Sequence, residues 1–355
     1  MAVKHSRRSG GLSRVSSISV PEFRVYSGEQ VRDVLDKDHH AVVAAVEAAY
    51  RAHHVGRTVN PDSYFLRFPG RDADRIIALP ARYVADGGAA ATGIKWISSF
   101  PQNIERGIAR ASAVLILNDE STGYPIACME AGSISATRTA ASAVSGLRLL
   151  SRDDRAPKSI AVIGTGVISN QVLTFLDRSD VPIERITLFD ANRDYAVRFA
   201  ARVREWSDVA VDIAPDIGTA IRSGEVVLFA TTAGTPHVHD PALFEHCPIV
   251  LHLSLRDLSP EIILSAHNVV DDVDHCMKAR TSLHLAEMQT GSREFVAHTL
   301  PGILCGAPIP ERDRPVVFSP FGMGILDIAL GDLVHSLIAG ATAPVKNFYL
   351  GAERF

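Results

Sequence analysis

The residues from Gly164 to Ser169 follow the pattern Gly-x-Gly-x-x-Ser, whose spacing is suited to binding a phosphate anion. An apolar run, Ile160–Ile163, precedes the pattern, and apolar residues at helical spacing follow it. Gly164 permits a tight turn, and Gly166 lets the backbone approach a pyrophosphate that would rest on the free N–H groups of the helix start. Ser169 stands where a third small residue lets the helix pack on the strand. This segment therefore predicts a dinucleotide-binding turn.

An acid follows at the place where the ribose of a dinucleotide would be bound. The apolar run Ile186–Phe189 ends in Asp190, whose carboxylate would accept hydrogen bonds from the ribose hydroxyls. Because a carboxylate disfavours a 2′-phosphate, NAD is predicted in preference to NADP, and Arg193 nearby moderates that preference. The predicted cofactor contacts are Gly164, Thr165, Gly166, Val167, Ile168, Ser169, Asp190, Arg193, Thr231 and Thr232.

A single charge interrupts a segment of small and apolar residues. Arg138 is the only charged residue between Ala131 and Gly146, where helical structure is expected. An unpaired guanidinium is costly to bury, so Arg138 needs an anion. That anion is either a substrate carboxylate held bidentately or a structural ion-pair partner, unless the side chain faces solvent.

Three further charged residues have two interpretations each. Lys95 and Arg67 lie in apolar, strand-like segments, and each is either a solvent-facing side chain or a ligand for an anion. Asp257 follows an expected strand, at the end of a parallel sheet where ligands bind. It either caps a helix that begins near Ser259 or transfers protons.

The elements that must position these residues fall into two series. Residues 29–57 favour a pair of amphipathic helices, and residues 131–150 favour a helix of small residues. Strand-like segments with short connections lie between them and predict an antiparallel sheet: Tyr64–Phe68, Arg75–Leu79, Ala90–Ile97, Ala113–Asn118 and Pro125–Glu130. From residue 158 strands alternate with helices, which predicts a parallel sheet whose loops 164–169, 231–236 and 254–260 share one crevice. One strand is expected over Ile249–Leu255, and a last helix from about 325 to 339.

Composition argues against several classes of function. The net charge is −4 and basic residues concentrate only near the start, so nucleic-acid binding is not expected. No apolar run is long enough to cross a membrane. The four cysteines lack metal-ligand spacing, so we expect free thiols, no metal site and a cytoplasmic location. Residues 1–23 lack the apolar segment of a signal peptide and indicate a disordered tail.

The chain resembles the ornithine cyclodeaminase/mu-crystallin family from about residue 24 to 345. The segments that carry the resemblance are Gly93-Ile-Lys-Trp96, Arg110-Ala-Ser112, Asn118-Asp119, Gly123-Tyr-Pro125, Met129-Glu130, Arg138-Thr-Ala-Ala141, the Gly164 turn, and Gly322-Met-Gly324 with Asp327. Within the family, the segments Asp74–Pro80, Gly93–Ile97 and Gly224–Val227 are similar to the dehydrogenases of 2,3-diaminopropionate biosynthesis, as in staphyloferrin B production.

The resemblance implies roles for particular residues. Arg67, Lys95 and Arg138 match the residues that clamp the α-carboxylate of an amino acid, and Lys95 is expected to contribute to catalysis as well. Asp257 matches the aspartate that acts on the substrate amine or on water. Arg106 and Arg110 are further candidates for binding additional carboxylates. Cyclodeaminases have a glutamate where this chain has Ile77, which argues against ornithine cyclisation.

The expected fold class is α/β, with a Rossmann-type dinucleotide-binding domain over residues 151–319. Residues 24–150 and 320–355 would form an α+β domain for substrate binding and, by resemblance, for homodimerisation. The expected activity is NAD-dependent oxidation of N-(2-amino-2-carboxyethyl)-L-glutamate, a small amino-acid substrate, to 2,3-diaminopropionate and 2-oxoglutarate. The alternatives are an ornithine-type cyclodeaminase, a ketimine or imino-acid reductase, and a binding protein like mu-crystallin.

Overall fold

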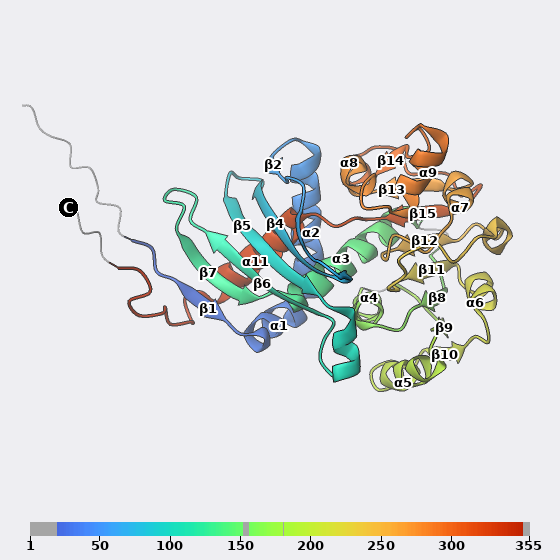
Figure 1. The fold of residues 1–355 in the computed structure, drawn as a ribbon, viewed down its shortest axis with the longest axis horizontal. Coiled ribbons are helices and arrows are strands. Elements are labelled where there is room, and N and C mark those ends of the chain that lie inside the picture. The colour runs from blue at the N-terminus through green and yellow to red at the C-terminus, as the bar shows by residue number, and fades with distance from the viewer. Residues whose placement is uncertain (1–19, 152–155, 180, 351–355) are drawn as a thin grey trace, which may run out of the picture.

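The computed structural model describes residues 20–151, 156–179 and 181–350, which form two sheets with helices packed on and between them (Figure 1). The strands of the first sheet are β1 (Arg24–Tyr26), β2 (Thr58–Val59), β3 (Tyr64–Phe68), β4 (Arg71–Val84), β5 (Ala90–Ser99), β6 (Ala111–Asn118) and β7 (Pro125–Glu130). The second sheet contains β8 (Ser159–Ile163), β9 (Arg185–Phe189), β10 (Ala210–Ile213), β11 (Val226–Phe229), β12 (Ile249–His252), β13 (His267–Val270), β14 (His298–Thr299) and β15 (Val316–Ser319).

The helices before the second sheet are α1 (Gly28–Lys37), α2 (His39–His54), the 3-10 helix η1 (Pro101–Arg106) and α3 (Gly132–Leu150). Those that alternate with its strands are α4 (Val167–Asp177), α5 (Arg193–Arg204), α6 (Ile217–Ser223), the 3-10 helix η3 (Pro241–Phe244), α7 (Pro260–Leu264), α8 (Val273–Cys276), α9 (Ser282–Thr290) and α10 (Leu300–Leu304). The last helix, α11 (Gly324–Ile338), returns to pack on β4, β5 and β6 of the first sheet.

The second sheet is parallel throughout, with the strand order β10-β9-β8-β11-β12-β15-β13-β14. The chain winds outward from β8 in one direction to β10 and then restarts beside β8 with β11, so the order reverses between β8 and β11. Ligands of such sheets bind outside the carboxyl ends of the strands at this reversal. The expected α/β class, with a Rossmann-type parallel sheet beside an α+β unit, is confirmed.

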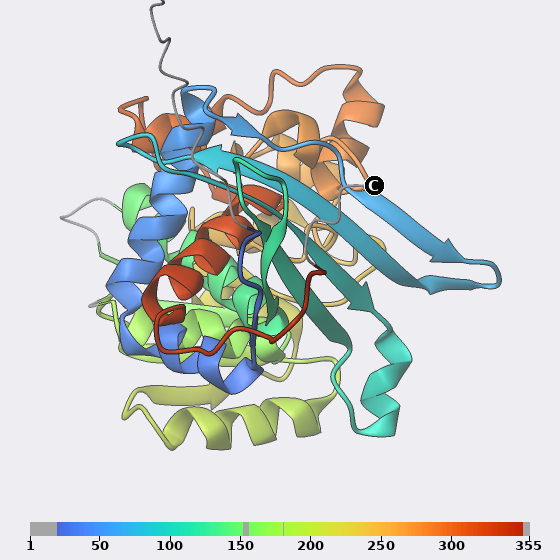
Figure 2. The ribbon, with the colours of Figure 1, turned by 90° about the vertical axis from the view of Figure 1, so that its left-hand side faces the viewer.

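The first sheet differs from the expected antiparallel one. Its order is β1-β7-β6-β5-β4-β2, with β3 paired to β4 off this path, and β1 pairs with β7 in parallel. Strand β1 was not predicted because three residues are too few to display alternation. Figure 2 shows the hairpin of β3 and β4 projecting beyond the other strands. The sheet is therefore mixed, and its projecting hairpin carries Arg67 and Arg75.

Two differences in the second sheet have a common cause. The strand expected over Ile249–Leu255 ends at His252, and Leu255 lies in a turn with φ 68°. Strand β15 was not predicted at all. Short apolar runs that are buried on both faces show no periodicity, so their presence and their limits are hard to locate from sequence alone.

Helix α3 joins the two sheets. It packs on α2, on α4 and on β12, and it lies between the sheets in Figure 1. Its small residues allow this close approach: a Cβ on Gly146 would meet the ring of Phe318, on β15, at 2.7 Å. Gln171 on α4 donates a hydrogen bond to Thr137, which precedes Arg138 on α3 (3.3 Å). One buried apolar cluster consequently includes residues of both sheets.

Residues 1–19 of the predicted tail lie outside the described residues. Phe23, at the end of that segment, is buried and stacks on Phe348 with ring centroids 3.8 Å apart. Within the described ranges, no helix has the length and apolar character needed to cross a membrane. The same residues contain no group of three or more histidine, cysteine or acidic side chains placed to hold a metal ion.

Candidate active site

The glycine turn lies between β8 and α4, at the reversal of the strand order. Gly164 adopts φ 90°, and a Cβ there would come within 2.8 Å of the carbonyl oxygen of Ala230 at the end of β11. A Cβ on Gly166 would meet nothing within 4 Å, so the space beside it is open. Gly166 caps α4 without a side-chain hydrogen bond, and the first turn has no acid. Free N–H groups and the helix dipole at this end fit a pyrophosphate.

Asp190 is tied directly to this turn. Its Oδ2 accepts hydrogen bonds from the N–H (2.9 Å) and the hydroxyl (2.8 Å) of Thr165, and its Oδ1 accepts one from the Asn192 N–H (2.9 Å). The acid at the end of β9 is therefore held beside the open space next to Gly166. The carboxylate keeps acceptor capacity for a ribose hydroxyl, because its two oxygens together offer about four acceptor sites.

The other predicted cofactor residues surround the same edge of the sheet. Val167, Ile168 and Ser169 form the first turn of α4, and the hydroxyl of Ser169 donates to the carbonyl of Gly164. Arg193 is exposed at the start of α5. Thr231 and Thr232 follow β11, with Thr231 half-buried and Thr232 exposed. The residues present thus fit a dinucleotide across the ends of β8, β9 and β11.

Lys95 and Arg138 share one buried carboxylate, that of Asp327 on α11. The Nζ of Lys95 lies 2.6 Å from Oδ2 of Asp327, and the Nε of Arg138 lies 3.4 Å from Oδ1. The side chains of Lys95 and Asp327 are 2% and 0% exposed, whereas that of Arg138 is 14% exposed. Burial, reinforced by Arg138, lowers the pKa of Lys95 to about 8 despite the opposing effect of Asp327. With Lys95 protonated, two cations and one anion leave a net charge of +1 for a further carboxylate to neutralise.

A glycine places the backbone against the guanidinium of Arg138. Gly322 adopts φ 89°, and a Cβ there would come within 2.3 Å of Nη1 of Arg138. The fully buried carboxylate of Asp271 holds this loop, because it accepts hydrogen bonds from the N–H groups of Phe321 (2.9 Å) and Gly322 (2.7 Å). Gly322 and Asp271 therefore position Arg138.

Asp257 is fully buried and does not cap a helix, since the N-cap of α7 is Ser259. Its Oδ1 accepts from the hydroxyl of Thr231 and lies 3.0 Å from Nε2 of His237, and its Oδ2 accepts from the hydroxyl of Ser254. Burial alone would raise the pKa of Asp257, but hydrogen bonds with His237, His252 and Ser254 outweigh burial and hold the pKa well below its ordinary value. The side chain of His237 is 38% exposed, so it is the exposed end of this buried network.

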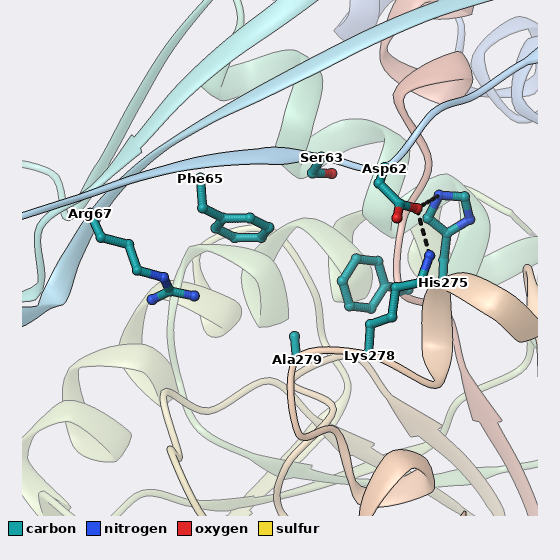
Figure 3. Close-up of a pocket in the computed structure, with 8 residues that line it drawn as sticks. Asp62, Ser63, Phe65, Arg67, His275, Lys278 and Ala279 are labelled. Carbon is teal, nitrogen blue, oxygen red and sulfur yellow. Dashed lines mark hydrogen bonds and ion pairs between the residues drawn. The ribbon is translucent and has the colours of Figure 1, made fainter.

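The remaining predicted substrate residues are distributed differently. Arg67 is exposed on β3 and lines a pocket with Phe65, Lys278 and Ala279, into which Arg67 and Phe65 both point (Figure 3). Arg110 is half-buried and donates to the hydroxyl of Ser99 (3.0 Å). Arg106 is exposed at the end of η1. The structure brings Lys95 and Arg138 together through Asp327, whereas no direct contact joins that pair to Arg67, Arg106 or Arg110 among the described residues.

Sequence reasoning assigned no role to two residues of this site. Asp327 entered only as part of a matching segment, yet it pairs with Lys95 and Arg138 from 232 and 189 positions away. An acid among the apolar residues of α11 was the available signal, but Asp332 on the same helix gives that signal too. His237 gave no local signal, because only the fold brings it to Asp257.

Comparisons with known proteins identify the family of this chain. The family model described as the ornithine cyclodeaminase/mu-crystallin family matches residues 28–341. The N-((2S)-2-amino-2-carboxyethyl)-L-glutamate dehydrogenase of Staphylococcus aureus is 33% identical over 306 residues, which cover 82% of this chain and 88% of that protein. The crystal structure of CmnK is 28% identical with a TM-score of 0.82, covering 93% of this chain and 99% of CmnK. An archaeal alanine dehydrogenase dimer with bound NAD is 24% identical with a TM-score of 0.80, covering 92% and 100% of the two chains. The chain belongs to the ornithine cyclodeaminase/mu-crystallin family.

Proposed function

We propose that this protein is an NAD-dependent oxidoreductase that cleaves N-(2-amino-2-carboxyethyl)-L-glutamate to 2,3-diaminopropionate and 2-oxoglutarate. The observation that carries the proposal is the buried cluster of Lys95, Arg138 and Asp327, whose net positive charge calls for a substrate carboxylate. The 33% identical dehydrogenase of Staphylococcus aureus supports the choice of substrate. The diaminopropionate would serve as a building block for a siderophore or a peptide natural product.

NAD would be held by the N–H groups of the Gly164 turn, with Asp190 on its ribose, and when bound it accepts a hydride from the substrate carbon. NAD is bound in the archaeal alanine dehydrogenase structure, and NADH in a structurally similar pyrroline-2-carboxylate reductase of Thermococcus litoralis. Arg138, together with Lys95, holds the α-carboxylate of the glutamate unit and directs its Cα–H toward the cofactor. Orientation of this kind can supply several kcal/mol of the barrier.

Asp257 and His237 provide the proton transfers. Loss of hydride leaves a substrate iminium, to which water adds with loss of a proton. Because the Asp257 carboxylate is buried and His237 is its exposed partner, the proton is accepted at the His237 ring, with Asp257 stabilising the resulting imidazolium. The carbinolamine then breaks its C–N bond, which releases 2-oxoglutarate and the diaminopropionate amine. The sum consumes one water and one NAD⁺ and yields NADH and a proton.

The cyclodeaminase alternative is disfavoured by the position of Ile77. This residue pairs with Ile97 on β5, two residues beyond Lys95, and therefore shares the face of the sheet that carries Lys95. The family's cyclodeaminases have a glutamate at this position, and an isoleucine cannot supply its carboxylate. Residues 24–150 and 320–355 would form the substrate and dimerisation domain, and residues 151–319 the nucleotide domain, of a homodimer like the alanine dehydrogenase.

The test is the absorbance of NADH with purified enzyme, NAD⁺ and N-(2-amino-2-carboxyethyl)-L-glutamate, beside a parallel sample with L-ornithine. Stoichiometric NADH and 2-oxoglutarate in the first sample alone are expected. Proline formed from ornithine without net NADH would identify a cyclodeaminase instead. If Asp257→Asn or His237→Gln leaves turnover within about twofold, the proton-transfer assignment for that residue is wrong.

A further inference from the structure

A row of cations crosses the first sheet on the face that carries Lys95. Arg67 on β3 lies opposite Arg75 on β4, and Arg75 lies opposite Ser99 on β5. Directly opposite residues project from the same face of a sheet. Arg110 joins the row because its guanidinium donates to the Ser99 hydroxyl (3.0 Å). Since Lys95 and Ser99 are four residues apart on β5, the row and the Lys95 clamp share one face.

A fourth guanidinium approaches the row from the second sheet. Arg256 follows the turn at Leu255 and donates to the carbonyl oxygen of Ala279 (2.8 Å). Ala279 lines the same pocket as Arg67 (Figure 3). We call Arg67, Arg75, Arg110 and Arg256 the arginine cluster. It includes residues of the projecting hairpin and of the loop that also carries Asp257.

The arginine cluster gathers like charges, and the carboxylate of Asp257, next to Arg256 in the chain, acts on Arg256 without forming an ion pair with it. Among the residues the structure describes, none of the four forms an ion pair. Burial, together with the neighbouring Arg256, Arg110 and Arg67, lowers the pKa of Arg75. Burial also lowers the pKa of Arg110, and it lowers the pKa of Arg256 despite the opposing effect of Asp257. By contrast, the half-buried Arg82 toward the other end of β4 is paired with Glu120 at 3.0 Å. Like charges gathered in a partly buried place are costly unless an anion joins them.

The distance along the sheet between Lys95 and the arginine cluster indicates what kind of anionic ligand could contact both. Lys95 and Ser99 are separated along β5 by about 13 Å of backbone. The long arginine side chains can bring their charged groups closer to the Lys95 ammonium than that. The intervening row on the same face is apolar and consists of Phe65, Ile77 and Ile97. A ligand that follows the sheet thus meets a cationic clamp, an apolar strip and then a second cationic region.

We propose that the arginine cluster is a second carboxylate subsite, which selects substrates carrying carboxylates beyond the α-carboxylate held at Arg138. This inference rests on the proposed function and deepens it, because N-(2-amino-2-carboxyethyl)-L-glutamate carries two such additional carboxylates on short aliphatic chains. Arg75 and Arg256 are the new specificity residues, and Arg110 shares their role. Arg67, which the resemblance matched to the α-carboxylate clamp, lies opposite Arg75 and is reassigned to this subsite. Monocarboxylic amino acids leave the cluster unneutralised and are bound poorly.

The experiment compares two small ligands on the full-length enzyme saturated with NADH. Titration calorimetry measures the affinity for 2-oxoglutarate and for 2-oxopentanoate, which has the same carbon chain without the second carboxylate. The wild type is expected to prefer 2-oxoglutarate by about 30-fold, as charge-assisted hydrogen bonds to one carboxylate would provide. Arg75→Met and Arg256→Met are each expected to reduce that preference to about threefold, while 2-oxopentanoate affinity stays unchanged. Arg82→Met is the matched control on β4 and should keep the full preference.

Three results would separate the possibilities. If the wild type, Arg75→Met and Arg256→Met all had the same preference for 2-oxoglutarate over 2-oxopentanoate, the proposal would be overturned. A loss of NADH affinity in the variants as large as the loss for 2-oxoglutarate would assign the cluster to the cofactor, and would also overturn it. An enzyme that prefers 2-oxoglutarate through the cluster but does not oxidise the proposed substrate would retain the subsite and refute the proposed function. Two independent variants guard against a single one that fails to fold.

Discussion

The two sides of the cleft are built to attract anions by different means. The turn after β8 offers backbone N–H groups at the start of α4, and all of them come from one continuous segment. The opposite side offers an ammonium and several guanidinium groups, which come from β3, β4, β5, the residue before β6, α3 and the loop after β12. A backbone site depends on local conformation, whereas a side-chain site depends on strand register and packing. The two should therefore respond to different substitutions.

The largest effect should come from the side-chain site. Arg138→Met removes the more exposed cation beside Asp327, and we expect kcat/KM for the proposed substrate to fall by about 1000-fold, since loss of a charged partner typically costs several kcal/mol. Steady-state kinetics at saturating NAD⁺ measure this. NAD⁺ affinity should not change, and Arg148→Met on the same helix, where Arg148 donates to the Ser179 carbonyl, is the control. If Arg138→Met mainly lowered the affinity for NAD⁺, the two sites would not be distinct.

The backbone site offers a matched pair of substitutions. Gly164→Ala places a Cβ 2.8 Å from the Ala230 carbonyl at φ 90°, so both the fold and the cofactor should suffer. We expect NAD⁺ affinity to fall about 100-fold and the free energy of unfolding to drop by about 1–3 kcal/mol. Gly166→Ala projects into open space and should weaken NAD⁺ binding with little loss of stability. Fluorescence titration and chemical denaturation separate the two outcomes. If Gly166→Ala binds NAD⁺ normally, the pyrophosphate does not pass there.

Asp190→Ala should have a smaller effect. We expect NAD⁺ affinity to fall about tenfold and the preference over NADP⁺ to narrow, because the carboxylate that repels a 2′-phosphate is lost. Thr165→Val is the control, since it keeps the carboxylate but removes one hydrogen bond to it. Unchanged NAD⁺ affinity in Asp190→Ala would show that the acid only supports the turn.

The smallest effect is expected from pH. Lys95 has a pKa lowered to about 8, so its ammonium predominates below that pH and is lost as the pH rises through it. If the charge serves the clamp, kcat/KM at saturating NAD⁺ should be about twofold lower at pH 8 than at its plateau near pH 7, and should continue to fall above pH 8. NAD⁺ affinity over the same range is the control. A rise through pH 8 would instead mean that the neutral amine of Lys95 acts as a base.

Sequence reasoning predicted the structure around the glycine turn more completely than the arrangement of the charged side chains. The glycine turn, Asp190 and most of the strands that carry them follow from local patterns, and β3 and β7 have the limits that were expected. The arginine cluster could not be anticipated as a unit, because Arg67 meets Arg75 only through the register of the β3–β4 hairpin. Asp327 and His237 join their partners through tertiary packing over long separations. The glycine turn can be predicted from local sequence, whereas the arrangement of the charged side chains depends on how the strands and helices pack together.

The hydrogen bond between Gln171 on α4 and Thr137 on α3 could couple the binding of the two ligands. The helix that begins at the phosphate turn is in contact with the helix that carries Arg138, next to Thr137 in the chain. If the cofactor shifts or stiffens α4, the same displacement reaches the carboxylate clamp. The affinities for the two ligands would then be linked, and each would enhance the other by the same factor. We accordingly expect NAD⁺ to raise the affinity for the amino acid by the same factor as the amino acid raises the affinity for NAD⁺.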